Sequence, residues 1–153
     1  RVYHALVKGN PGQGTVNAPI DHAEGHGTKR EVREGGKEAI THYRTIKTTG
    51  EYSLVECKLE TGRTHQIRAH LSYMGHPIFG DPKYGDAVLN KKLTSGYGLH
   101  MQLLHAWHLV FPELSGDFEG LSGKSIYAPA PKQFVSIAQK RGLGTWEHGI
   151  PEV

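Results

Sequence analysis

Cysteine, long apolar stretches and aspartate are all scarce in this sequence. The single cysteine, Cys57, has no partner for an internal disulfide, which favours a reducing compartment. No run of about eighteen apolar residues is present, and the amino end has no charged segment followed by an apolar one. Neither a membrane span nor secretion is indicated, so the cytoplasm is the expected location.

The eleven histidines do not form a recognisable metal-binding motif. His105 and His108 are three residues apart, but their segment has the pattern of a strand. Neither a His-Glu-x-x-His motif nor a cysteine pair accompanies them. We therefore expect no metal site.

What the chain does contain is typical of one globular domain. It has 153 residues, of which 37% are hydrophobic and 22% charged, enough to bury a core. A formal charge of +3 and a pI near 9.0 permit a nucleic-acid partner without requiring one. The chain starts at Arg1, without methionine, in a strand-like alternation, so we expect a piece of a longer protein.

Alternating and β-branched segments outnumber helical ones. Strands are predicted at 2–7, 14–20, around 29–33, on both sides of Thr48-Thr49-Gly50, at 100–111 and at 125–131. Helices are predicted from Thr64, as the cap, to Gly75, and over 131–142 with Phe134, Ile137 and Ala138 on one face. The polar stretches 21–37 and 86–98 are predicted as loops or insertions. This pattern predicts an α+β fold with a mixed, mostly antiparallel sheet and a few short helices, as a single domain over 1–153.

The first predicted helix carries the densest set of candidate functional residues. Ile67, Leu71 and Met74 define its buried stripe, so Arg68 lies beside the core rather than in solvent. Arg63 and His65 flank the start of the helix, where free backbone N–H groups attract anions. Such a helix start can bind a phosphate or a carboxylate.

The stretch "LETGRTHQIRAHLSYMGHPIFGDPKYG" resembles the central motif of the RluA-type RNA pseudouridine synthases almost position for position. The resemblance extends to "RVYHALVKG", "GTVNAPI", "GGKEAITHYRTI", "LLHAWHLVF" and "YAPAPKQF", in the same order, and so covers most of the chain. Mild departures are Ala69, where the family usually has a β-branched residue, and Phe111-Pro112-Glu113, where His-Pro is common.

The resemblance implies isomerisation of a uridine in structured RNA to pseudouridine, without cofactor or metal. In that family the nucleotide is flipped into a pocket, and an aspartate acts on the sugar or base. A tyrosine stacks on the uracil and assists proton removal, and an arginine pairs with the aspartate. By motif, the tyrosine is Tyr3 and the arginine is Arg68. A ring on a strand gives a rigid stacking surface, and a guanidinium beside the core can hold a carboxylate bidentately.

One part of the family's pattern is missing. The catalytic aspartate of the family lies in a His-Arg-Leu-Asp motif, and none of the four aspartates here has that context. Asp81, before Pro82, and Asp86 are typical of turns. We therefore expect an incomplete catalytic domain, its carboxy-terminal part, which is inactive on its own. Sheet edges left exposed by the missing part would allow self-association.

Two other functions remain open. In a non-catalytic RNA-binding module, Lys29, Arg30, Arg33, Lys37, Lys91 and Lys92 would contact phosphates and no chemistry would follow. For the synthase, the expected RNA contacts are Arg63, His65, Lys29 and Arg30. In a phosphate-binding hydrolase, the turn at Asp81 would act, although Gly-Asp-Pro alone has little specificity. The segment "SGKSIYAPAP" favours large-subunit ribosomal RNA as the substrate of the synthase.

Overall fold

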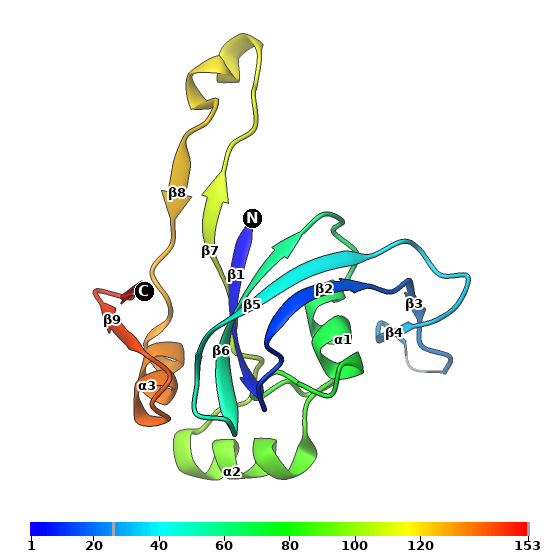
Figure 1. Ribbon diagram of the computed structural model, residues 1–153, viewed down its shortest axis with the longest axis vertical. Helices are drawn as coiled ribbons and strands as arrows, with labels where there is room; N and C mark the ends of the chain where they lie inside the picture. Colours follow the sequence, from blue (N-terminus) through cyan, green and yellow to red (C-terminus); the bar gives the residue numbers. More distant parts are fainter. Residues whose placement is uncertain (26, 153) are drawn as a thin grey trace.

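The computed structural model describes residues 1–25 and 27–152, and within them a central antiparallel sheet organises the chain (Figure 1). Its six strands follow the order β2-β5-β6-β1-β7-β8, with every pairing antiparallel. Their bounds are β1 Val2–Lys8, β2 Gln13–Asn17, β5 Ile40–Thr48, β6 Tyr52–Leu59, β7 Leu104–Val110 and β8 Ser125–Tyr127. Two short pairs complete the strands: β3 Ile20–His22 with β4 Arg30–Val32, and β9 Thr145–Glu147 with β10 Ile150–Glu152.

The helices are few and short. They are α1 Gln66–Tyr73, α2 Ala87–Tyr97 and α3 Lys132–Lys140, with a 3-10 turn, η1, at Gly116–Leu121. The predicted α+β class, with a mostly antiparallel sheet and a few short helices, is confirmed. Among the described residues, none of these helices has the length and apolar character needed to cross a membrane.

The central strand β1 is buried on both faces, which explains its nearly continuous apolar sequence. Ala5 and Val7 point to one face and join a core cluster with Ile67 and Leu71 of α1. Leu6 points to the other face, into a cluster that includes residues of α2 and α3. Tyr3 is two residues before Ala5, so its ring lies on the α1 face.

The outer strands lead into an extended arm. In Figure 1, β7 runs upward to the arm that ends in η1, and β8 returns downward from it; the amino end of β1 lies beside β7. The tip exposes large apolar side chains, Phe118 among them at 65%. The strands β2 and β8 form the two edges of the sheet.

The predicted loop at 21–37 is in part a hairpin. β3 and β4 pair from Ile20↔Val32 to His22↔Arg30, close to the short strand predicted near 29–33. His26, which falls inside this predicted loop, lies outside the described residues. Backbone hydrogen bonds join Ile20 and Lys37 reciprocally at 2.9 Å, so the two ends of the segment are held together.

The predicted loop at 86–98 is wrong, because residues 87–97 form α2. The Asp86 side chain accepts a hydrogen bond from the Leu89 N–H at 2.8 Å and caps the helix, while Gly98, at φ 66°, ends it. Leu89 and Leu93, one turn apart, are its buried residues. The cap, the apolar pair and the closing glycine are all visible in the sequence, but the polar residues between them outweighed this pattern.

Helix α1 also starts differently from the prediction. The residue at its amino-terminal boundary is His65, in a left-handed conformation at φ 56°, and no side chain caps the helix. Thr64 is therefore not the cap. The carboxy-terminal end follows the prediction: Gly75 has φ 83°, and the His76 N–H donates to the Leu71 carbonyl at 2.8 Å.

Candidate active site

A polar pocket lies where the amino end of β1 meets the start of α1. It has a volume of about 340 Å³. Tyr3 comes from β1, Arg63, His65 and Arg68 from the start of α1 and the segment before it, and Leu104 from β7. Four of the six predicted site residues therefore line one cavity. Tyr3 is sixty or more positions away from the other three in the sequence. We call this cavity the site pocket.

Arg68 forms the innermost charged group of the site pocket. Its Nε and Nη2 donate to the two carboxylate oxygens of Asp81 at 2.9 and 2.8 Å, a bidentate pair. The Asp81 side chain is fully buried, and that of Arg68 is 10% exposed. The prediction placed Arg68 beside the core, which is confirmed. It treated Asp81 as a turn residue, or as the acting group of a hydrolase, and not as the partner of Arg68.

Asp81 is also a turn residue, and the turn is clamped by α2. Its Oδ1 accepts from the N–H groups of Lys83 and Tyr84 at 3.0 Å each. Asn90 of α2 accepts from the Gly80 N–H and donates to the Asp81 carbonyl, both at 2.8 Å. Helix α2, which was predicted as a loop, therefore fixes the position of Asp81, and Asp81 fixes the orientation of Arg68.

The charge state of this pair follows from its surroundings. Burial alone would raise the pKa of Asp81, but hydrogen bonds from Arg68 and from the two backbone N–H groups lower it overall. The Asp81 carboxylate in turn raises the pKa of the Arg68 guanidinium. Both groups are ionised at neutral pH, and neither oxygen of Asp81 is open to solvent.

The pairing with Asp81 leaves part of Arg68 free to act. A guanidinium has five N–H donors, and the bidentate pair uses two of them, on the Nε and Nη2 edge. The remaining edge, with Nη1, can hold a second anion in the pocket that Arg68 lines. Asp81 thus fixes the direction of the guanidinium without consuming its capacity to bind.

Tyr84 contacts the cationic groups of Arg68 and Lys29, the backbone of Arg30 and the His65 ring. The Arg68 guanidinium carbon lies 5.0 Å from the centre of the Tyr84 ring, and the Lys29 ammonium 5.6 Å from it. The hydroxyl accepts from the Arg30 N–H at 2.7 Å and lies 2.9 Å from His65 Nδ1. Lys29 and Arg30, both predicted RNA contacts, are therefore tied to the site through one ring.

The His65 imidazole is held neutral by this arrangement. Burial first, and then the nearby positive charges of Arg68, Lys83 and Arg30, lower the pKa of His65. The Tyr84 hydroxyl accepts from the Arg30 N–H and also lies 2.9 Å from His65 Nδ1. In the tautomer in which this hydroxyl donates to Nδ1, the proton of the neutral ring is on Nε2. His65, which lines the site pocket, can then donate one hydrogen bond.

A buried polar network fixes the start of α1 against the sheet. Gln66, 2% exposed, donates through Nε2 to Ile40 O and Thr41 Oγ1 and accepts through Oε1 from the Arg63 N–H. Thr41 Oγ1 also lies 2.8 Å from His70 Nδ1. These contacts hold the start of α1 against the sheet, although no side chain caps the helix. Gln66 was not among the predicted site residues, and with Thr64 expected as the cap no signal in the sequence pointed to it.

Other candidate positions do not converge on the site pocket. His105 Nε2 lies 2.8 Å from the Ala128 carbonyl, whereas the His108 ring stacks on Tyr127 at 4.2 Å. In the part of the chain that the structure describes, no three His, Cys, Asp or Glu side chains form a potential metal cluster.

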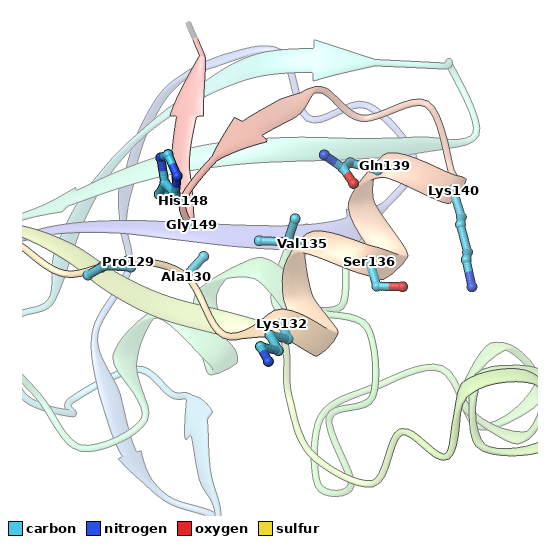
Figure 2. Close-up of a pocket in the computed structure, with 9 residues that line it drawn as sticks. All are labelled: Pro129, Ala130, Lys132, Val135, Ser136, Gln139, Lys140, His148 and Gly149. Carbon is cyan, nitrogen blue, oxygen red and sulfur yellow. The ribbon is translucent and has the colours of Figure 1, made fainter.

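A larger pocket, of about 490 Å³, lies beside α3 (Figure 2). Lys132, Val135 and Gln139 of α3 face the segments that carry Ala130 and His148. Its lining contains no carboxylate, no tyrosine and none of the predicted site residues. This cavity is larger than the site pocket, but only the site pocket contains the predicted site residues.

Comparison with known proteins shows the family of the chain. Residues 1–73 match the family model described as RNA pseudouridylate synthase. An uncharacterized RNA pseudouridine synthase of Chloroflexus aurantiacus is 46% identical over 110 residues, which are 71% of this chain and 33% of that protein. The ribosomal large subunit pseudouridine synthase D of Zymomonas mobilis is 42% identical over 130 residues, 82% of this chain and 39% of that protein.

Solved structures show the same relationship. The human RNA pseudouridylate synthase domain containing 4 has a TM-score of 0.69 and 25% identity, covering 95% of this chain and 63% of that one. The human RNA pseudouridylate synthase domain containing 1 has a TM-score of 0.68 and 26% identity, covering 85% and 54%.

The fold and the sequence define one class of protein, the RNA pseudouridine synthases. Within that class the chain belongs to the RluA-type family, as its central motif predicted. The chain spans about two fifths or less of the length of the two bacterial relatives described above.

Proposed function

We propose that this chain forms part of the catalytic domain of an enzyme that converts uridine in RNA to pseudouridine. The observation that carries the proposal is the convergence of Tyr3 and Arg68 in one pocket. These are the two positions at which the family's motif places a stacking tyrosine and a carboxylate-binding arginine. We further propose that the catalytic aspartate comes from outside these 153 residues.

The geometry supports a role for each residue. Tyr3 lies on a central strand, where the backbone of β1 is bonded on both sides, so its ring is a rigid surface for a base. Arg68 is aligned by Asp81 and has a free edge for the incoming carboxylate. Arg63, His65, Lys29 and Arg30 lie at or beside the pocket and are the proposed RNA contacts.

The hydrolase alternative loses its physical basis. A hydrolase at the turn would need the Asp81 carboxylate to reach a substrate or a water molecule. Both of its oxygens accept hydrogen bonds from protein groups, and its side chain is fully buried. Asp81 is better explained as a positioning residue.

A direct assay separates the enzyme from a non-catalytic RNA-binding module. The longer protein that contains this chain, and the 153-residue chain alone, are incubated with a large-subunit ribosomal RNA transcript, and nucleosides are separated by chromatography. We expect pseudouridine from the longer protein and none from the chain alone. Tight RNA binding by the longer protein without any pseudouridine, over a full set of ribosomal RNA segments, would favour the binding module.

We also propose ribosomal RNA as the substrate, the cytoplasm as the place of action, and no cofactor. The relative from Zymomonas mobilis supports the substrate through its name. Self-association is a further proposal, since β2 and β8 have unpaired outer edges within the described sheet.

A further inference from the structure

A second, smaller groove adjoins the site pocket on the side of the β3–β4 hairpin. It has a volume of about 220 Å³ and lies between β3, β4 and the segment that precedes α1. Three cationic side chains line it: Arg30 of β4, Lys37 and Arg63. Asp21 is its single acidic residue, and His22 adds an imidazole. We call this the hairpin groove.

The cations of the hairpin groove are not neutralised by the protein. None of Arg30, Lys37 and Arg63 forms an ion pair with a carboxylate of residues 1–25 or 27–152. Arg63 Nε donates to the Glu38 carbonyl at 2.7 Å, and the Arg30 guanidinium donates to His22 Nδ1. Neither partner is a carboxylate, so these contacts orient the guanidinium groups without pairing them with an acidic side chain.

A comparable groove on the sheet is built differently. It lies across β2, β5 and β6, has a volume of about 280 Å³, and also contains two cations, Arg44 and Lys58. Both lie near Glu56, at 3.2 and 3.9 Å. The hairpin groove differs because its three cations form no ion pair with its one carboxylate, whereas both cations of the other groove are paired with Glu56. Unpaired cations are the arrangement expected where the missing anion belongs to a ligand.

Arg63 connects the hairpin groove to the site pocket, because its side chain lines both. In RNA every nucleotide is joined to its neighbours through phosphates. A nucleotide held against Tyr3 and Arg68 therefore has its own phosphates at the rim of the pocket, within reach of the shared arginine.

We propose that the hairpin groove binds a backbone phosphate of RNA next to the nucleotide in the site pocket. This proposal rests on the proposed function, because it assumes that the site pocket receives a nucleotide. Lys37 and His22, which the family resemblance did not single out, become binding residues. Lys29 is excluded from this role, since it lies over the Tyr84 ring and does not line the groove.

The test measures how RNA affinity depends on salt. Each phosphate contact made by a cation to single-stranded RNA contributes about 0.7 to the slope of log affinity against log salt concentration. The probe is an oligouridylate of about ten nucleotides, within the range of single-strand binding sites. We expect Lys37→Gln and Arg30→Gln each to reduce the slope by about 0.7, and the double variant by about twice that.

Arg44→Gln is the matched control, because Arg44 also lines a groove of the same sheet-containing domain but is paired with Glu56. Its slope should equal that of the unchanged chain. Equal slopes in all variants, or equal reductions in Arg30→Gln and Arg44→Gln, would overturn the proposal. Competition by inorganic phosphate at constant ionic strength distinguishes a site for free phosphate from a site for the RNA backbone. Displacement of the oligouridylate by micromolar phosphate would overturn the proposal of RNA backbone binding.

The outcome is separable from that of the proposed function. Pseudouridine formation in the longer protein with unchanged salt slopes in the variants would refute the groove and keep the enzyme. Reduced slopes without pseudouridine would keep the groove and refute the enzyme.

Discussion

Arg63 and Arg68 both lie near the start of α1, but they differ in burial, in ion pairing and in their contacts. Arg68 is buried, paired bidentately with Asp81 and packed against the Tyr84 ring. Arg63 is exposed, has no carboxylate partner among the described residues, and touches only a backbone carbonyl through Nε. Arg68 belongs to the inner part of the site, with Asp81 and Tyr3, and Arg63 to the outer part, with the hairpin groove.

The difference between the two arginines predicts different roles for the inner and the outer part of the site. A buried, bidentate guanidinium has one orientation and can support a reaction that depends on geometry. An exposed cation contributes long-range attraction that salt screens. We therefore expect changes in the inner part to affect turnover and changes in the outer part to affect RNA affinity.

The largest effect is expected from Arg68→Ala. It removes the group that would hold the catalytic carboxylate, and losses of about 10²- to 10³-fold in turnover accompany removal of such a donor. It also leaves Asp81 buried without its partner, at a cost of about 3 to 5 kcal/mol in the free energy of unfolding. Pseudouridine formation and urea denaturation of the longer protein measure the two effects.

Arg68→Lys keeps this prediction testable if the alanine variant unfolds. Lysine retains the charge but loses the bidentate geometry, so the fold should persist while turnover falls. RNA affinity should stay close to that of the unchanged protein. A fully active Arg68→Lys or Arg68→Ala enzyme would refute the assignment.

A smaller loss is expected from Tyr3→Ala. Stacking of a base on an aromatic ring is worth about 1 to 3 kcal/mol, or roughly 5- to 150-fold. Single-turnover rates of pseudouridine formation should fall by a factor in that range. Tyr3→Phe retains the ring and tests only the hydroxyl. Unchanged rates in Tyr3→Ala would remove the ring from the mechanism.

The acid stability of the protein tests the Asp81 carboxylate, with its Arg68 pair and its two turn hydrogen bonds. The folded-state pKa of Asp81 is lowered, so its contribution to stability is fully present above the unfolded value of about 3.9. That contribution is lost as pH falls through the folded value. We expect Asp81→Asn to flatten the dependence of unfolding free energy on pH below about 4, by at most about 1.4 kcal/mol per pH unit. Asp117→Asn, at an exposed position in η1, is the control and should leave the slope unchanged.

The inner part was only half predictable from the sequence. The spacing of Ile67 and Leu71 placed Arg68 beside the core, and the family motif assigned it a role. Its partner was missed because Gly-Asp-Pro is equally typical of a turn, and Asp81 does form one. A buried arginine needs a nearby carboxylate, and in a chain with four aspartates this requirement alone would have made Asp81 a candidate.

The outer part depends on contacts that sequence patterns do not reveal. Arg30 and Arg63 are 33 positions apart, and only the β3–β4 hairpin, held at its ends by Ile20 and Lys37, brings them to one groove. Within the loop predicted at 21–37, the short strand near 29–33 was expected, but glycines and charges hid its pairing with a strand at Ile20–His22. Which cations are neutralised is likewise a matter of tertiary contacts, as the pairing of Arg44 with Glu56 shows.

The most direct measurement combines both parts in one experiment on the longer protein. The rate of pseudouridine formation at saturating RNA, and the salt dependence of RNA affinity, are measured for Arg68→Lys and Lys37→Gln. If the inner part supports the reaction and the outer part binds RNA, Arg68→Lys lowers the rate of pseudouridine formation and leaves the salt slope unchanged. Lys37→Gln keeps the rate and reduces the salt slope by about 0.7 to 0.9. Proportional losses of rate and slope in both variants would contradict these separate roles.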